Sequence, residues 1–253
     1  MQTAMSKPAS TRLDQRLLSD GLVASRARAR DLILRGFVMV DGAPCTKPAQ
    51  SVGLEASIVL ADHAPDFVSR GGEKLAAALD AFALDPAGMI ALDAGASTGG
   101  FTQVLLQRGA RRVYAVDVGQ SQLHESLRAD ARVISLEGYD VRQIQAAPIE
   151  GPIGMLVADL SFISLTKAMG PVMSLAAPGA FLVALIKPQF ELSPADIGKG
   201  GIVRDAEARN RAVKVVRAFV ALQPGWRVLG VVASPIAGGS GNEEFLLGAS
   251  KDA

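Results

Sequence analysis

Three charged residues, Asp93, Asp159 and Lys187, each follow an apolar run of the kind that forms a buried strand. If these strands are parallel, their carboxyl ends meet at one edge of a sheet, which is where ligands usually bind. Carboxylates at such an edge can bind a cationic ligand, and a lysine among them can take part in proton transfer. Any one of the three is most simply a strand reaching the surface. Together they favour a ligand-binding site.

The stretch 89–119 contains the element that would place a ligand at that edge. It has the pattern of a strand, a glycine-rich turn at 95–100 (GASTGG), a helix and a second strand that carries Asp117. Such a βαβ unit brings backbone N–H groups close to a ligand. Asp117 lies 22 residues after Gly95 (117 − 95), near the usual distance for a carboxylate that binds a ribose. The stretch predicts a cofactor that contains adenosine; the alternative is an ordinary βα turn without a ligand.

One residue of this turn distinguishes between cofactors. The dinucleotide fingerprint requires glycine at its first, third and sixth positions, because backbone must contact the pyrophosphate there, and Ser97 occupies the third position. S-adenosylmethionine has no phosphate, and its cationic sulfonium and ammonium groups suit a site rimmed by acids. We therefore expect S-adenosylmethionine, with NAD as the second alternative. The residues expected to contact the cofactor are Asp93, Gly95, Ala96, Ser97, Thr98, Gly99, Gly100, Phe101, Asp117, Asp140 and Asp159.

Composition excludes several other classes of protein. Of the 253 residues, 49% are hydrophobic and 20% are charged, which is ordinary for a globular protein. The longest apolar run, Ala180–Ile186, is far shorter than the roughly 20 residues that a membrane-spanning helix needs, and the N-terminus lacks the apolar core of a signal peptide. With Cys45 as the only cysteine and two histidines, neither a disulfide nor a metal centre is expected. We predict a cytoplasmic, metal-independent protein that does not bind membranes.

Charge is distributed unevenly along the chain. Residues 1–60 contain eight lysines and arginines against five acidic residues, a net charge of +3, which leaves −2 for the remainder of a chain whose total is +1. A basic segment ahead of a larger, mildly acidic one suggests that the front of the chain binds a polyanion.

The basic segment has the pattern of a small module of helices and strands. Thr11 and Asp14 resemble a capping box at the start of one helix, and Ser25 is placed to cap a second helix that ends before Gly36. Strands are expected at 37–40 and 57–60. On the second helix Arg26 and Arg30 share a face, and together with Arg35 they could contact a phosphate backbone. The alternative is a merely solvated helix face.

The order of residues in this segment is more specific than its charge. LDQRLLSDGLVASRARARDLILRGFVMVDG strongly resembles the S4 RNA-binding domain, over roughly residues 11–60. No aromatic residues are interleaved for stacking on single-stranded bases, so the resemblance implies recognition of folded RNA by shape and phosphates. The predicted RNA contacts here are Arg12, Arg26, Arg30 and Arg35. We expect an S4-like domain at 1–60, a linker at 61–69 and a second domain at 70–253.

The second domain continues the alternation of strands and helices. A helix is expected from Arg70, and further strands are expected at 133–136, 153–159, 179–186, 228–233 and 245–247. Helices are expected at 164–176 and after Asp205. Parallel strands that alternate with helices predict an α/β fold with a doubly wound, Rossmann-like sheet.

Motifs spread over the chain carry a second resemblance. LDAGASTGGFTQVLLQRGARRVYAVDVG, ADLSFISL, IKPQFE, SRGGEKL and GNEEF together resemble the haemolysin A-like (TlyA-type) family, from Thr11 onward and in the same order. This resemblance implies an S4 domain joined to an FtsJ-like ribose 2′-O-methyltransferase domain that acts on ribosomal RNA or a ribosomal subunit. It maps a catalytic set onto Lys74, Asp159, Lys187 and Glu244, although Glu243 stands beside the last. Arg70 and Phe162 are expected beside the substrate. The name suggests membrane lysis, which the lack of an insertable apolar segment argues against.

The implied chemistry is coherent. A ribose 2′-hydroxyl must lose a proton while it attacks the cofactor's methyl group, and lysine is a poor base at its ordinary pKa of about 10.4. A neighbouring Lys74 ammonium and partial desolvation would lower the pKa of Lys187 and allow it to act as the base. Asp159 would orient Lys187, and Glu244 would hold Lys74. No metal is required.

Two alternatives of other classes stay open. ADLSF also resembles the Asp-Pro-Pro-Phe-type motif of base amino-methyltransferases, although both prolines are absent, and that chemistry needs no lysine pair. A non-enzymatic alternative is an RNA-binding ribosome assembly factor that retains a methyltransferase fold. The modified nucleotide and the ribosomal subunit are not predicted.

Overall fold

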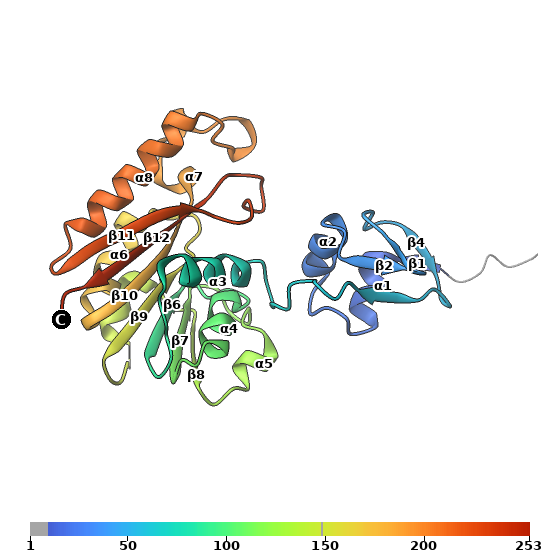
Figure 1. Cartoon of the computed structure of the whole chain (residues 1–253), viewed down its shortest axis with the longest axis horizontal. Coiled ribbons are helices and arrows are strands. Elements are labelled where there is room, and N and C mark those ends of the chain that lie inside the picture. Colours follow the sequence, from blue (N-terminus) through green and yellow to red (C-terminus); the bar gives the residue numbers. More distant parts are fainter. Residues whose placement is uncertain (1–9, 148) are drawn as a thin grey trace, which may run out of the picture. The chain divides into compact units, whose positions relative to one another are not determined.

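The computed structural model describes residues 10–147 and 149–253. Residues 1–9, the start of the predicted first domain and the segment scanned for a signal peptide, lie outside the described residues. The chain divides into two compact units between Val68 and Ser69 (Figure 1). The linker predicted at 61–69 spans this boundary, because residues 61–68 lie in the first unit and Ser69 begins the second.

The first unit is a small α+β module. Helices α1 (Leu13–Ser19) and α2 (Arg26–Leu34) pack against each other. Strand β1 (Ser10–Arg12) pairs with β4 (Ser51–Gly53), and β2 (Val38–Val40) pairs with both β3 (Ala43–Pro44) and β5 (Ile58–Leu60), all antiparallel. Its core consists of Leu13, Leu17, Val23, Ala29, Leu32, Ile33, Val38, Cys45 and Val52.

Of the two helix caps predicted in this unit, one is confirmed and the other is wrong. Ser25 caps α2 as predicted and accepts a hydrogen bond from the backbone N–H of Arg28. The capping box predicted at Thr11 is wrong: Thr11 pairs with Val52 between strands, and Arg12 occupies the N-cap without a side-chain cap bond. Pairing between β1 and β4 extends the backbone up to Arg12, which leaves Thr11 one residue too early to cap α1.

The second unit is built on a seven-stranded sheet with the order β11-β12-β10-β9-β6-β7-β8 within the described residues. Neighbours from β8 to β10 are parallel, whereas β12 runs antiparallel between β10 and β11. The predicted doubly wound α/β fold is confirmed, but an entirely parallel sheet is not. The strands are β6 (Ile90–Ala94), β7 (Arg112–Asp117), β8 (Val133–Glu137), β9 (Ile153–Ala158), β10 (Ala176–Ile186), β11 (Trp226–Ala233) and β12 (Phe245–Lys251).

Helices cover both faces of this sheet (Figure 1). On one side α3 (Gly71–Phe82) and α4 (Gly100–Gln107) contact each other and the strands, and on the other α6 (Leu165–Ser174) and α8 (Ala206–Ala221) do so. Asp205 caps α8 as predicted, by accepting hydrogen bonds from two backbone N–H groups of its first turn. Buried Leu, Val, Ile, Met and Ala side chains of the strands fill the layers between.

One close approach sets the position of α3 over β12. Gly248 lies under the Phe82 ring, where an added Cβ would come within 2.6 Å of the ring. A larger residue would push the helix away from the sheet. Phe82 is the last residue of α3, and Gly248 lies in the middle of β12. The first turn of α3 then lies near the start of β12, where Lys74 pairs with Glu244.

Short elements were the ones that periodicity did not predict. They span too few residues to show a repeat of apolar positions. Besides β1, β3 and β4, they are α5 (Glu125–Arg128), α7 (Pro188–Glu191), η1 (Val141–Ala146), η2 (Pro194–Asp196) and η3 (Lys199–Gly201).

Candidate functional site

The candidate site lies where the strand order reverses, between β6 and β9. Both neighbouring strands end there, and the loops that follow them separate to leave a crevice. Gly95 follows β6 with φ +85, and an added Cβ would lie 2.7 Å from the backbone oxygen of Asp159. A side chain at position 95 would therefore force apart the two loops that form the crevice.

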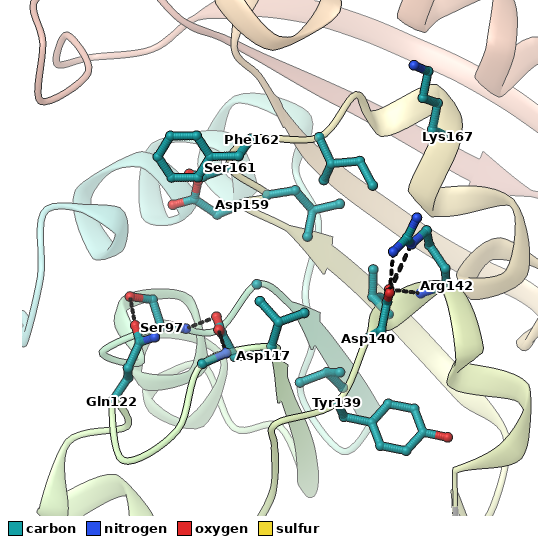
Figure 2. A pocket seen from close by; sticks show the side chains of 17 residues that line it. Ser97, Asp117, Gln122, Tyr139, Asp140, Arg142, Asp159, Ser161, Phe162 and Lys167 are labelled. Atoms are coloured by element: carbon teal, nitrogen blue, oxygen red, sulfur yellow. Dashed lines mark hydrogen bonds and ion pairs between the residues drawn. The ribbon is translucent and has the colours of Figure 1, made fainter.

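A cavity of about 820 Å³ opens at this point, and most of the predicted cofactor residues line it or its neighbour. In Figure 2, Asp159 and Phe162 lie on one side of the cavity and Asp117 and Tyr139 on the other. A smaller cavity of about 150 Å³ adjoins it and shares Gly95, Ser97 and Asp159 with the first. Ala96, Thr98, Gly100 and Phe101 line the smaller cavity, together with Ser69, Gly71, Ser161 and Lys187.

Asp117 is held at the end of β7 by backbone donors. The N–H of Ser97 donates to its Oδ2 at 2.8 Å, and the N–H of Gly119 donates to Oδ1 at 2.7 Å (Figure 2). A carboxylate oxygen can accept a second hydrogen bond, so Asp117 retains acceptors for ligand hydroxyls. Asp140 caps η1 and forms an ion pair with Arg142 on the same cavity wall.

Asp93 lies behind the cavity rather than on its surface. Its side chain is fully buried within β6, and Thr102 of α4 donates to its Oδ2 at 2.7 Å. Its Oδ1 accepts no hydrogen bond from any described residue. Burial raises the pKa of Asp93 to about 7, the Thr102 hydrogen bond opposes this, and the nearby carboxylates Asp159 and Asp117 raise it further. Asp93 is therefore a buried carboxyl group without a cationic partner among the described residues, and its environment disfavours the ionised form.

Lys187 and Asp159 form the first ion pair of the predicted catalytic set. The Nζ of Lys187 lies 2.7 Å from Asp159 Oδ1, and it also donates to the Ser161 hydroxyl at 2.7 Å. The two residues end the neighbouring parallel strands β10 and β9. Both side chains are less than one quarter exposed.

Lys74 and Glu244 form the second ion pair, which joins residues 170 positions apart. Lys74 lies in the first turn of α3, Glu244 precedes β12, and both side chains are buried. Glu243 instead points outward with 65% of its side chain exposed and pairs with Arg209 at 3.2 Å. The choice between the two glutamates is thereby resolved geometrically in favour of Glu244 as the partner of Lys74.

A third cavity of about 450 Å³ connects the two ion pairs. Lys187 and Glu244 both line it, together with Phe162, Gln189 and Phe190. Of the two ion pairs, only Lys187 and Asp159 also line the smaller cavity that contains the glycine turn. Lys187 and Ser161 each line both this cavity and the smaller one.

The remaining predicted contacts lie in several places. Arg70 is the N-cap of α3 and reaches the turn that precedes Glu244, where its Nη2 would be 2.8 Å from a Cβ at Gly239. Gly99 starts α4 and packs against Leu127, away from the cavities.

In the first unit, three of the predicted arginines surround one acid. Arg12 and Arg26 form ion pairs with the buried Asp14 at 2.9 and 3.1 Å, and Arg30 approaches it to 4.0 Å. Arg35 is separate from this group: it pairs with Asp31, and its guanidinium lies over the Phe37 ring.

Several residues of the cavity walls were not predicted. Gln122 and Tyr139 line the large cavity, while Ser161, Gln189 and Phe190 line the one around Lys187. What these residues share in the sequence is their position, because each one lies within a few residues after the end of a parallel strand. Their identities alone do not distinguish them from other loop residues.

The cavities suit the predicted cofactor. Asp117 retains free acceptors for hydroxyl groups, Gly95 and Gly71 leave room close to the backbone, and the Asp159 carboxylate lines both cavities. In the described part of the chain, no three His, Cys, Asp or Glu side chains gather as metal ligands would. No helix among these residues is both long and apolar enough to cross a bilayer.

Comparisons with known proteins agree with this geometry. Residues 67–251 match the FtsJ-like methyltransferase family, and residues 11–58 match the S4 domain. The 16S/23S rRNA (cytidine-2′-O)-methyltransferase TlyA of Mycobacterium tuberculosis is 47% identical over 237 residues, which cover 93% of this chain and 88% of that protein. Hemolysin A of Brachyspira hyodysenteriae is 39% identical over 236 residues, covering 93% of this chain and 98% of that one.

A solved structure is similar over almost the same length. A protein described as a hemolysin, from Streptococcus thermophilus, has 39% identity and a TM-score of 0.74, with 98% of this chain and 90% of that chain covered. The family match spans most of the chain, and the relatives share both its S4 region and its catalytic region. The chain therefore belongs to the FtsJ-like methyltransferase family, in the haemolysin A-like (TlyA-type) group that carries an S4 domain.

Proposed function

We propose that this protein transfers a methyl group from S-adenosylmethionine to the 2′-hydroxyl of a cytidine in ribosomal RNA. The single observation that carries the proposal is the convergence of two ion pairs, Lys187–Asp159 and Lys74–Glu244, on one cavity beside a cofactor-sized cavity. The cytidine specificity follows from relatives that are named for it.

The large and small cavities would hold the cofactor. Asp117 would accept hydrogen bonds from its ribose, Asp140 would lie beside its adenine, and the turn at 95–100 would contact it through backbone groups. Asp159 would face its cationic end, and Asp93 would remain buried behind the cavity. S-adenosylmethionine bound there supplies an electrophilic methyl group.

Lys187 would act as the general base. Its amine lies at the junction of the cofactor and substrate cavities, so it can accept the proton of a hydroxyl that enters from the third cavity. Asp159 and Ser161 hold the amine in place. Glu244 lines the same cavity and neutralises the buried Lys74, which would otherwise be an unpaired charge.

The S4 unit would supply affinity and placement, but no chemistry. Its arginines Arg12, Arg26 and Arg30 outnumber the single acid that they surround, which leaves positive charge for RNA phosphates. Acting on ribosomes, the protein would work in the cytoplasm.

Methyl transfer to isolated ribosomal subunits, followed by mapping of 2′-O-methylated nucleotides, tests the proposal. Lys187→Ala should lower turnover about 10²–10⁴-fold and leave the binding of S-adenosylmethionine unchanged, because the base acts in the transition state. Lys187→Arg should be nearly as inactive, since a guanidinium stays protonated.

Lys214→Ala, on the exposed face of α8, is the matched control and should keep full activity. Lys187→Arg that methylates at the wild-type rate would contradict the base mechanism. A methyl found on a base nitrogen would identify a base amino-methyltransferase. Binding of cofactor and RNA without any transfer would indicate an assembly factor.

A further inference from the structure

Ser161, in the loop after β9, lies where the three cavities meet. The large cavity, the smaller cavity and the third cavity all have it in their walls. Asp159 lines only the first two of these, and Lys187 lines only the last two. Ser161 is therefore the only described residue that lines all three. Its side chain lies at the point where a cofactor and a second substrate would come together.

The hydroxyl of Ser161 accepts the one aligned hydrogen bond of the Lys187 amine among the described residues. The Nζ of Lys187 donates to Ser161 Oγ at 2.7 Å. Asp159 Oδ1 is equally close to Nζ, at 2.7 Å, but this contact lacks the alignment of a hydrogen bond. Attraction between charges depends on distance alone, whereas a hydrogen bond weakens steeply when it is misaligned. Asp159 therefore supplies charge beside the amine, and Ser161 supplies direction.

A carboxylate joins the loop that carries Ser161 to the segment that follows Lys187. Glu191, four residues after Lys187, accepts hydrogen bonds from the backbone N–H of Leu165 at 2.8 Å and from the Ser164 hydroxyl. Ser164 is the N-cap of α6 and ends the loop that contains Ser161. The two partners of the hydrogen bond are therefore held at a fixed spacing by a contact that includes neither of them.

The backbone next to Ser161 is also held in an unusual conformation. Phe162 has φ +64, a left-handed conformation that is rare for a bulky residue and persists only where the surrounding structure holds it. Its ring forms an aromatic pair with Phe190, with 5.3 Å between centroids and a tilt of 50°. Phe190 lies in α7, which begins directly after Lys187. Contacts within the protein thus hold the chain on both sides of the hydrogen bond between Ser161 and Lys187.

This hydrogen bond determines where the lone pair of Lys187 points when the amine is neutral. A neutral amine has two hydrogens and one lone pair. If one hydrogen is donated to Ser161 and the other faces the anionic Asp159, the lone pair is left to face the cavities. The proton of a substrate hydroxyl can then pass to it: the O–H bond breaks, its electron pair stays on the oxygen, and the amine becomes an ammonium. Without Ser161, the amine can rotate about its Cε–Nζ bond.

We propose that Ser161 is a positioning residue for methyl transfer, which acts through Lys187 by orienting its amine toward the 2′-hydroxyl. The proposal rests on the proposed function, in which Lys187 is the base. It adds to the two ion pairs a neutral group that gives direction rather than charge. A serine suits this role, because its hydroxyl accepts a hydrogen bond without placing a second negative charge beside Asp159. Loss of the hydroxyl should therefore lower kcat and leave the affinities for cofactor and RNA unchanged.

The test compares two substitutions of Ser161 in full-length protein, with S-adenosylmethionine and ribosomal subunits that lack the modification. Ser161→Ala should lower kcat roughly 10- to 100-fold, as expected when one hydrogen bond to a group that becomes charged is lost. The KM for the subunit, and cofactor binding measured by calorimetry, should be unchanged. Ser161→Thr keeps the hydroxyl and should restore most of the rate. Ser174→Ala, which removes an exposed hydroxyl at the end of α6, is the control and should keep the full rate.

A double variant separates orientation of Lys187 from direct contact between Ser161 and RNA. In Lys187→Ala, adding Ser161→Ala should cause no further loss of the residual single-turnover rate, because no amine remains to be oriented. A full further loss would show that Ser161 contacts the substrate itself and would overturn the proposal. A raised KM for the subunit with unchanged kcat in Ser161→Ala, or equal losses in Ser161→Ala and Ser161→Thr, would also overturn it.

The outcomes separate this proposal from the proposed function. If wild type methylates ribose, Lys187→Ala is inactive and Ser161→Ala is fully active, the positioning role is wrong and the function stands. If Lys187→Ala keeps the full rate, Lys187 is not the base and Ser161 has no amine to orient. If wild type methylates no ribose on either subunit, the function itself is wrong.

Discussion

Each unit of the molecule buries one aspartate completely, and the two aspartates have opposite properties. Asp14 of the S4 unit and Asp93 of the methyltransferase unit both have no solvent-exposed surface. Hydrogen bonds from Arg12 and Arg26 lower the pKa of Asp14 to about 2, against the opposing effect of burial. Burial raises the pKa of Asp93 to about 7, and neighbouring carboxylates add to the shift.

The difference shows that burial alone does not decide the charge of a carboxyl group. Asp14 is covered by arginines that are themselves about half exposed, so its charge is matched and remains near solvent. Asp93 is instead hydrogen-bonded to Thr102, which carries no charge. The S4 unit therefore holds arranged positive charge suited to an anion, and the methyltransferase unit holds one buried carboxyl group, Asp93, without a cationic partner among the described residues.

The largest loss of stability is expected on changing Glu244, the buried carboxylate of the methyltransferase unit that has Lys74 as its cationic partner. Glu244→Gln leaves Lys74 buried and unpaired, so the free energy of unfolding should fall by about 3–5 kcal/mol. Fluorescence of Trp226, the only tryptophan, reports unfolding of this unit. Glu243→Gln, beside it but exposed, should change stability by less than about 0.5 kcal/mol; equal effects would show that burial of the pair is unimportant.

Asp93 should make the stability of the methyltransferase unit decline with rising pH. Because the native pKa is raised from 3.8 to about 7, the contribution is fully present below pH 3.8 and is lost as the pH rises through about 7. The loss should be on the order of 3–4 kcal/mol. In Asp93→Asn this contribution should be absent, measured as the difference between variant and wild type in urea unfolding across this range.

A cation in the cofactor cavity should lower the pKa of Asp93. A bound sulfonium or ammonium favours the ionised Asp93, so binding of S-adenosylmethionine near pH 7 should release a proton. Calorimetry in buffers of different ionisation enthalpy measures this release. Asp93→Asn should bind without it, and an identical release in the variant would assign the proton to another group.

Asp14 should show the opposite and smaller pH dependence. Its native pKa is lowered from 3.8 to about 2, so its contribution is present above pH 3.8 and is lost as the pH falls through about 2. Asp14→Asn should cost about 1–2 kcal/mol, because the charged hydrogen bonds involve half-exposed arginines that solvent can satisfy. Hydrogen exchange of α1 and α2 amides, at pH values on either side of this window, measures the change. If Asp14→Asn leaves the hydrogen-exchange protection of these amides unchanged, Asp14 does not stabilise the two helices.

The smallest effect is expected for a single arginine of this cluster. Arg30 is the most distant from Asp14, at 4.0 Å, and is the freest of the three to meet a phosphate. Arg30→Gln should weaken binding to ribosomal subunits and reduce the slope of log affinity against log salt by about 1. Arg35→Gln should have a smaller effect, since Arg35 already pairs with Asp31. Equal slopes for Arg30→Gln and wild type would exclude this contact.

Local patterns in the sequence predicted much of the scaffold. The turn at 95–100, the caps at Ser25 and Asp205 and the main parallel strands follow from turn chemistry, capping and apolar runs, which act between residues close in the chain. Motif resemblance predicted the family, which the comparisons confirm, and a catalytic set that stays a prediction. The capping box at Thr11 failed because Thr11 pairs with Val52 of β4, 41 residues away (52 − 11), and this pairing overrides a local preference.

Tertiary structure decided what depends on distance through space. The antiparallel insertion of β12, the choice of Glu244 over Glu243, the charge of Asp93 and the aromatic pair at Phe162 all arise from contacts between segments far apart in the sequence. The sequence alone determined which residue types lie at the ends of the strands and where turns and helix caps occur. Packing decided which of those residues come into contact and whether a buried acid has a cationic partner. The reason is that electrostatic and hydrogen-bond energies depend on separation and burial in the folded molecule.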